Sequence, residues 1–279
     1  MNAHTLTWRG GAPVAAVDGG ALRPDLLGPL DAQAVARTPL GRAGASIGDH
    51  FRVDSSSAPE GALILREAPA LDRLGARMGS GHLVVEGDAG DELGCAMAGG
   101  RITVKGGAGR RVGGPDPLPL PTPSDRGMTG GTVLVMGDAG DYTALRCRRG
   151  LIAVGGSLGL SPGYQMIGGT VLASRCDGDG AGLHLRRGTL LLTGLPDAEA
   201  WEPGDAYAFE AEVAAAALPV FAVVLRRAIE CGWPAPQALT GGGLARAMER
   251  WHMGRLRVFR GDRHELNRGE VIAWLKPSV

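Results

Sequence analysis

One short pattern, an apolar run of strand length that begins after a glycine, recurs through the middle of this sequence. The glycines that begin these runs are Gly61, Gly81, Gly100, Gly131, Gly150, Gly169 and Gly188. Their position numbers increase in steps of 20, 19, 31, 19, 19 and 19, and the long step contains a proline-rich insertion at 114–127 that we interpret as a loop. Because a repeat of about 19 residues leaves no room for a crossover helix between strands, the pattern predicts a parallel β-solenoid with one turn per repeat.

The apolar runs contain two columns that support this prediction. Two places after each lead glycine stand Leu63, Leu83, Ile102, Val133, Ile152, Val171 and Leu190, and four places after stand Leu65, Val85, Val104, Val135, Val154, Ala173 and Leu192. Side chains alternate in direction along a strand, so both columns are expected to point into the coil.

Between the strands, glycines recur in the pattern G-x-x-G-x-x-x-G, as in Gly87, Gly90 and Gly94. One turn departs from the pattern, with Ala144 in place of the third glycine. Since glycine reaches positive φ without a Cβ clash, we expect these positions to be tight corners of the coil.

The outward-facing strand positions change character along the chain. Early turns carry polar residues there, such as Arg101 and Lys105, whereas later turns carry Leu134, Leu172 and Leu191. An apolar outer face indicates either an interface with another chain or a cover formed by the C-terminal segment of this chain, and the sequence leaves both open.

The two ends of the chain lack the glycine rhythm. Residues 1–40 are expected to cap the first turn, residues 41–195 to form the solenoid, with a weak first turn at 47–53, and residues 196–279 to form a helical and strand extension. In the extension we expect a helix over 208–232, broken or kinked near Pro219, a second over 244–252, and two closing strands.

Composition excludes several functional classes. The 29 basic and 29 acidic residues balance, so nothing draws the chain to nucleic acid or to an anionic membrane. No apolar run of membrane-spanning length and no signal-peptide core occurs, which predicts a cytoplasmic protein.

The chain offers few residues for chemistry. The four cysteines are far apart, form no C-x-x-C motif and are expected to be buried free thiols. The six histidines form no metal-binding motif and are expected at the surface, so we predict no metal site and no catalytic residues in this chain. Aspartates recur across turns in the segments GDAGD, as they would in a β-helix carbohydrate-active enzyme, but aspartate favours turns for its own reasons.

Two pairs of arginines form the one candidate binding site. Arg148 and Arg149 precede the strand at Gly150, while Arg186 and Arg187 precede the strand at Gly188. Their offset corresponds to two turns, so both pairs are expected at one corner, about 10 Å apart. Such an arginine ridge could hold a polyanionic chain or an acidic partner, and the alternative is a solvated corner with scattered salt bridges.

These residues resemble a known family, the C subunit of formylmethanofuran dehydrogenase. The resemblance rests on IGDHF, on LGARMGSGHLVVEGDAGDELGCAMAGGRITVKGGAG, and on the ending RGD…NRGEVIAW, and covers the chain from about residue 40 to its end. The repeat M-x-x-G-x-[IL]-x-V-x-G-x-A-G is shared with the C-terminal domain of the large subunit of glutamate synthase. The resemblance implies a right-handed parallel β-helix.

The resemblance also implies a function within a complex. Only Lys105 and Lys276 among the basic residues are lysines, a bias typical of GC-rich bacteria, where this family occurs in a formyltransferase/hydrolase complex. That complex transfers a formyl group from formyl-tetrahydromethanopterin to a methanofuran analogue and hydrolyses the product to formate. The implied partners are an amidohydrolase-like A subunit with a metal such as zinc, a B subunit and a formyltransferase-like D subunit.

On this interpretation the chain is a non-catalytic scaffold without a cofactor of its own, and the arginine ridge contacts an anionic coenzyme tail or a partner. The alternatives are the C subunit of a molybdenum or tungsten formylmethanofuran dehydrogenase and, from another class, the β-helix carbohydrate-active enzyme.

Overall fold

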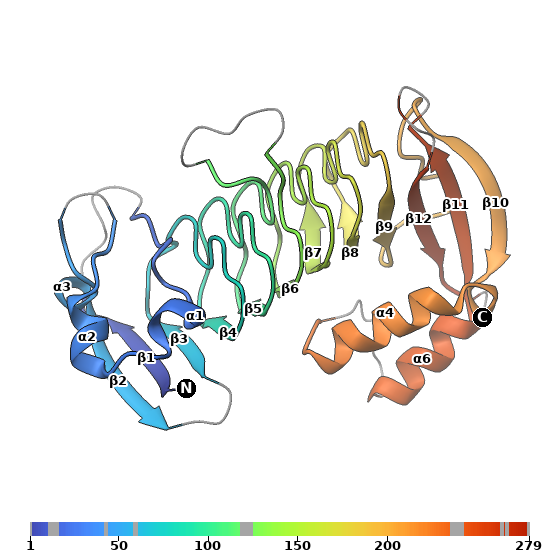
Figure 1. Cartoon of the computed structure of the whole chain (residues 1–279). Helices are drawn as coiled ribbons and strands as arrows, with labels where there is room; N and C mark the ends of the chain where they lie inside the picture. The colour runs from blue at the N-terminus through green and yellow to red at the C-terminus, as the bar shows by residue number, and fades with distance from the viewer. Residues whose placement is uncertain are drawn as a thin grey trace.

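The protein is mainly β, and most of its strands are stacked side by side in one elongated body (Figure 1). The computed structural model describes residues 2–10, 17–41, 44–57, 61–117, 125–234, 243–262, 265 and 268–277. Within them lies a single 12-stranded sheet, in the order β10-β11-β12-β9-β8-β7-β6-β5-β4-β3-β1-β2.

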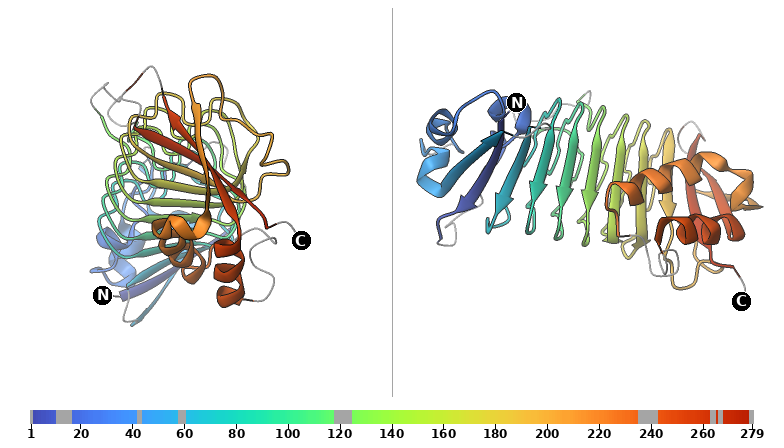
Figure 2. Two further views of the ribbon diagram at one scale, coloured as in Figure 1. Left: turned by 90° about the vertical axis from the view of Figure 1, so that its right-hand side faces the viewer. Right: turned by 90° about the horizontal axis from the view of Figure 1, so that it is seen from below.

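The repeat forms seven consecutive parallel strands. They are β3 (Ala62–Arg66), β4 (His82–Val85), β5 (Arg101–Val104), β6 (Thr132–Val135), β7 (Leu151–Leu158), β8 (Thr170–Cys176) and β9 (Gly188–Leu192). Each pairs in parallel with the strand one repeat later, so that Leu83 faces Ile102 and Val133 faces Ile152. Seen from its C-terminal end, the chain winds round in superimposed turns (Figure 2, left).

Three columns of side chains fill the inside of these turns. Every member of the two strand columns predicted to point inward is at most 1% exposed. The third column stands three places before each lead glycine from Gly81 onward and consists of Met78, Met97, Met128, Cys147, Met166 and Leu185, each at most 2% exposed. Unbranched methionines suit this position because they adapt to an irregular gap between turns.

Most corner glycines are required for a reason other than positive φ. Of the three in each turn, only the third, as in Gly94 and Gly113, has a positive φ, and Ala144 adopts the same conformation at φ 64°. At Gly156 an added Cβ would lie 2.0 Å from Oδ1 of Asp138 in the preceding turn. The close approach of successive turns, and not backbone conformation, therefore requires glycine there.

The N-terminal segment closes one end of the coil. Strand β1 (Asn2–Trp8) pairs in parallel with β3 and places Leu6 in line with Leu65 of the interior. Helices α1 (Pro24–Leu27), α2 (Ala32–Arg37) and α3 (Ile47–His50) lead into β2 (Phe51–Ser57), which runs antiparallel to β1. The weak solenoid turn predicted at 47–53 is therefore wrong, since this segment forms α3 and the start of an antiparallel edge strand.

The C-terminal extension continues the coil and covers its outer face. It comprises β10 (Ala208–Ala214), the 3₁₀ turn η1 (Ala215–Ala217), α4 (Pro219–Glu230), α6 (Gly243–Met253), β11 (Arg255–Gly261) and β12 (Gly269–Leu275). The helix predicted over 208–232 is wrong for its first third, because Ala208–Ala214 pairs antiparallel with β11. Pro219 begins α4, where its missing N–H breaks no helical hydrogen bond.

The apolar outer column of the later turns is buried within this chain. Leu134, Leu172 and Leu191 are 0% exposed and pack in one cluster with Leu225 of α4 and Trp251 of α6. Figure 2 (right) shows both helices across the C-terminal strands. Of the two alternatives for this face, the intramolecular cover is confirmed.

Candidate functional site

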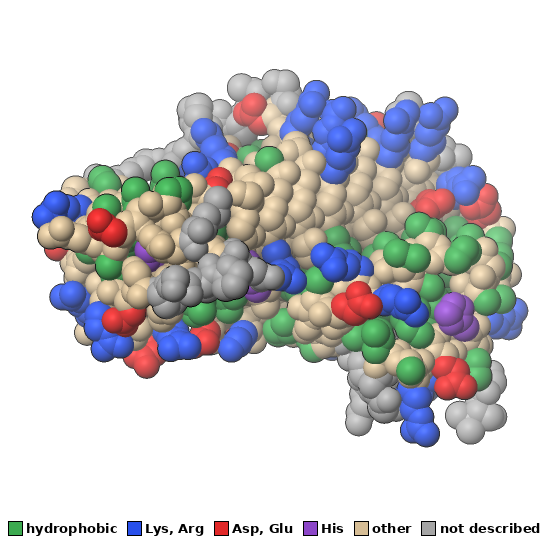
Figure 3. Space-filling view, turned by 60° about the horizontal axis from the view of Figure 1, so that its bottom comes forward, with side chains coloured by type: hydrophobic (Ala, Val, Ile, Leu, Met, Phe, Trp, Pro, Cys, Tyr) green, Lys and Arg blue, Asp and Glu red, His purple; other side chains and the backbone are tan. Residues whose placement is uncertain are grey.

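The arginine ridge lies where the register predicts. Arg148 and Arg149 precede β7 with Gly150 between, and Arg186 and Arg187 directly precede β9. Strand β8 lies between them, with Leu151 opposite Thr170 and Thr170 opposite Thr189. The two pairs thus occupy equivalent positions two turns apart, separated by about 10 Å at the ordinary spacing of strands. Figure 3 shows Lys and Arg side chains gathered along the upper edge of the coil.

One of the four predicted arginines has a partner within the chain. The guanidinium of Arg186 lies 2.9 Å from the carboxylate of Glu265, which also lies 3.5 Å from Nδ1 of His184. Among the described residues, Arg148, Arg149 and Arg187 make no side-chain hydrogen bond or ion pair. Arg149 and Arg187 are exposed and Arg148 is half-buried. These three guanidinium groups can therefore donate hydrogen bonds to a carboxylate or phosphate from outside the chain.

The sequence reasoning missed a row of aromatic rings that ends at His184, which shares Glu265 with Arg186 of the ridge. The rings of Tyr142 and Tyr164 are 5.8 Å apart, and those of Tyr164 and His184 are 5.4 Å apart, both edge to face. Tyr142 is 40% exposed, and Leu160 on the adjoining turn is 46% exposed. The sequence feature that could have predicted this row is the stretch 141–149, which contains one tyrosine and three arginines within a single repeat.

On earlier turns the corresponding face is closed by an ion cluster. Asp116, at the start of the insertion, has a side chain only 4% exposed, 3.0 Å from Nη2 of Arg73 and 2.5 Å from Nε of Arg77. Arg73 also pairs with Asp18 at 2.5 Å, which ties the N-terminal segment to the coil. Residues 118–124, the middle of the predicted insertion, lie outside the described residues.

The recurrent aspartates serve the backbone of the next turn. Oδ1 of Asp88 accepts from the N–H of Gly107 at 2.8 Å, and Oδ1 of Asp138 from the N–H of Ser157 at 2.7 Å. Asp91 accepts from the backbone N–H of Arg110 at 2.8 Å and from its guanidinium. Burial disfavours the ionised form of Asp91, but the hydrogen bonds from Arg110 outweigh burial and hold the pKa of the carboxyl below its usual value. These carboxylates are engaged in joining turns.

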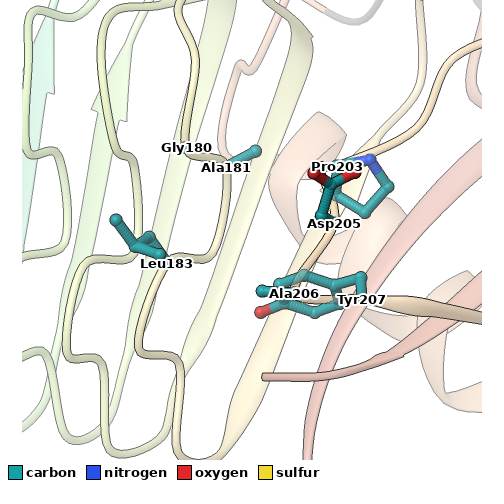
Figure 4. Close-up of a pocket in the computed structure, with 8 residues that line it drawn as sticks. Gly180, Ala181, Leu183, Pro203, Asp205, Ala206 and Tyr207 are labelled. Atoms are coloured by element: carbon teal, nitrogen blue, oxygen red, sulfur yellow. The ribbon is translucent and has the colours of Figure 1, made fainter. Parts of the chain in front are cut away.

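A small cavity lies where the last turn meets the extension (Figure 4). It has a volume of about 200 Å³ and is lined by Gly180, Ala181, Leu183 and residues 203–207. The hydroxyl of Tyr207 donates to the carbonyl of Gly182 at 2.7 Å, and burial raises the pKa of this phenol. Asp205, the one carboxylate in the lining, is exposed. The lining is mostly backbone and small apolar side chains, and its geometry positions no nucleophile beside a base.

All four cysteines are free thiols. Burial raises the pKa of Cys95 and of Cys147 to about 12 and that of Cys176 to about 11. Cys231 is half-buried, 3.7 Å from Nη1 of Arg101. The prediction of buried free thiols is confirmed for Cys95 and Cys147 and is wrong for Cys176 and Cys231, which are half-buried.

The histidines do not all lie at the surface. The expectation is wrong for His4, which is 1% exposed with Nδ1 2.7 Å from Oγ of Ser55 and Nε2 3.1 Å from the carbonyl of Leu27. Strand β1 carries His4 at an inward-facing position, opposite Leu63. His264 lies outside the described residues.

Neither a metal-binding cluster nor a membrane-spanning helix occurs among the residues that the structure describes. The described residues contain no group of three or more His, Cys, Asp or Glu side chains placed to bind a metal ion. No helix in the described segments combines the length and apolar character that crossing a bilayer requires.

The comparisons with known proteins include a full-length structural similarity. No protein-family model matches the sequence, and no curated protein matches it. A solved structure does match, with a TM-score of 0.68 and 28% sequence identity, over 99% of this chain and 100% of the other. That chain belongs to the formyltransferase/hydrolase complex (FhcABCD) of Methylorubrum extorquens, in complex with methylofuran. From end to end, this protein is therefore similar to one subunit of that complex.

Proposed function

We propose that this protein is the C subunit of a formyltransferase/hydrolase complex and acts there as a non-catalytic scaffold. The observation that carries the proposal is the similarity along the whole of both chains, at 28% identity, to one chain of such a complex. Because almost every residue of both chains is aligned, the similarity extends beyond the repeats to both ends of the chain. The family resemblance of the repeats and of the ending RGD…NRGEVIAW favours the C subunit among the subunits.

In this proposal the fold is a right-handed parallel β-helix with one sequence repeat per turn. The parallel register of β3 to β9 and the three buried interior columns support it. Isolated parallel bridges from Ala89 to Ala108 and from Ala108 to Ala139 add a second line of contacts between turns, away from the main strands. Stacked turns joined along two lines make a stiff body.

A stiff body suits the holding of two other subunits at a fixed separation. In the proposed complex one partner transfers a formyl group from formyl-tetrahydromethanopterin to a methanofuran analogue, and another hydrolyses the product to formate. A fixed short distance between the two sites raises the effective concentration of the intermediate at the second site. The carboxylates that a β-helix hydrolase would need are instead engaged with backbone N–H groups, which favours the scaffold over that alternative.

The arginine ridge is the proposed contact for an anionic group of the coenzyme or of a partner. Its available members are Arg148, Arg149 and Arg187, since Arg186 pairs with Glu265. Reversing these three charges to glutamate is expected to weaken assembly or formyl transfer. If both are unchanged, the ridge has no such role.

The experiment that tests the function is native mass spectrometry of the protein purified from its own host, with subunits and metals identified. Recovery with an amidohydrolase-like and a formyltransferase-like chain, without molybdenum, tungsten or iron–sulfur clusters, supports the proposal. A pterin-bound metal with clusters would instead assign the chain to a formylmethanofuran dehydrogenase. Recovery of the chain alone overturns the scaffold.

A further inference from the structure

One exposed face of the later turns has the composition of a protein interface. It carries Tyr142, Leu145, Leu160 and Tyr164, which we call the tyrosine face. Tyr142 and Leu160 are 40% and 46% exposed, and Leu145 and Tyr164 are half-buried. Arg148 and Arg149 follow Tyr142 on the same turn. Two turns on, the equivalent Arg186 shares Glu265 with His184, whose ring contacts Tyr164. Tyrosine and arginine are the residues enriched at the centre of protein–protein interfaces.

On the earlier turns the same face is covered by another segment of this chain. Backbone hydrogen bonds between turns show which residues of the early and late turns occupy the same position. Arg73 donates its N–H to the carbonyl of Asp91 one turn on, and Tyr142 donates in the same way to the carbonyl of Leu160. Arg73 and Tyr142 also share a left-handed backbone, at φ 57° and 56°. Tyr142 therefore occupies on the later turns the position that Arg73 occupies on the first.

The cover of the earlier turns is a short acidic segment with proline. Residues 114–116 are buried there, and the carboxylate of Asp116 lies between the guanidinium groups of Arg73 and Arg77. The earlier turns therefore show what kind of segment can bind this face. It is a non-helical segment whose carboxylate pairs with arginines of the coil. On the later turns Tyr142 and Leu160 stay exposed, while Arg148 and Arg149 make no side-chain contact with a carboxylate of the described residues.

We propose that the tyrosine face binds an acidic, non-helical segment of another subunit, with a carboxylate of that segment paired to Arg148 or Arg149. The inference rests on the proposed membership in a multi-subunit complex and adds which face of this chain makes contact. Charge complementarity selects an acidic partner, and the exposed rings and leucine select a polypeptide over a plain polyanion, which would need the arginines alone. The outer face of the strands is not available to a partner on the later turns, because α4 and α6 cover it.

A site-specific cross-link tests this contact in the intact complex. Tyr142 is replaced by a photoreactive benzoylphenylalanine, and the complex is purified through this chain and irradiated. The matched control is the same replacement at Val223 on α4, which is 67% exposed. The expected result is a cross-link from position 142 to a peptide of another subunit that contains Asp or Glu, at a yield at least about tenfold above that from position 223.

Two results overturn the inference in distinguishable ways. If the other subunits are recovered but position 142 gives no more product than position 223, or links to a non-peptide molecule, the face is not this interface and the proposed function still stands. If no other subunit is recovered, the proposed function fails as well.

Charge reversal gives an independent test of the paired carboxylate. Replacing Arg148 and Arg149 by Glu is expected to lower the affinity for the partner by about tenfold or more and to flatten its salt dependence. Replacement of the exposed Arg226 of α4 by Glu is the control and is expected to change neither. Equal affinity for both variants overturns the pairing.

Discussion

The contact between Asp138 and Gly156 explains why glycine recurs in the coil, and it can be measured with a double-mutant cycle. In Gly156→Ala the new Cβ would lie 2.0 Å from Oδ1 and 3.0 Å from Cγ of Asp138, while the next atom, the carbonyl carbon of Gly137, is 3.1 Å away. The carboxylate must therefore move, which breaks its 2.7 Å hydrogen bond to the N–H of Ser157.

The size of the effect follows from two opposing contributions. Loss of a hydrogen bond to a charged but exposed carboxylate, with the added crowding, costs about 1–3 kcal/mol. Alanine lowers the entropy of the unfolded chain, which returns about 0.4–1 kcal/mol. Gly156→Ala is thus expected to destabilise the parent by about 1–2 kcal/mol, but to be within about 0.5 kcal/mol of neutral when Asp138 is already Ala, a coupling of at least about 1 kcal/mol.

Urea unfolding followed by far-ultraviolet circular dichroism measures the four free energies of unfolding, with the m-value as the check on cooperativity. The control is Gly87→Ala. Gly87 occupies the same corner as Gly156 on an earlier turn, but the nearest atom to its new Cβ is the carbonyl oxygen of Ala68 at 3.8 Å. This variant is expected to be neutral or slightly stabilising. If Gly156→Ala costs the same with and without Asp138, or if Gly87→Ala costs as much, the close approach of the carboxylate is not the reason for glycine.

Three further predictions concern the cover, the aspartates and the thiols. Leu172→Ala, beneath the helices of the extension, is expected to destabilise by about 2–5 kcal/mol through the cavity it leaves, and a smaller loss in urea unfolding would mean that the cover is loosely packed. The pKa of Asp91 is lowered in the fold, so its ionised form stabilises the protein above the ordinary value of 3.8, and this contribution disappears as pH falls through the folded value. The stability difference between parent and Asp91→Asn should therefore vanish in acid, and a difference that persists unchanged at low pH contradicts this. With pKa values of about 12, Cys95 and Cys147 should not react with a disulfide reagent at pH 8 until the protein unfolds, and rapid labelling of the native protein would show that burial does not protect them.

The sequence alone determined the repeating part of the fold, because the signal there is local and periodic. Strand β6, for instance, is specified by an apolar run between glycines, and its inward positions Val133 and Val135 follow from alternation along a strand. The period of about 19 residues, once the insertion at 114–127 is set aside, then specifies which strands are neighbours. The same arithmetic placed Arg148 and Arg187 at one corner, and the register of β7 to β9 agrees.

Tertiary structure decided what depends on segments far apart in the chain. Residues 208–214 have helical composition but form β10, since β11 offers an unpaired edge to them. The apolar outer column could have faced another protein, and only the fold shows α4 and α6 covering it. Likewise the pairing of Arg186 with Glu265 removes one of four similar arginines from the candidate site, across 79 residues that no repeat relates.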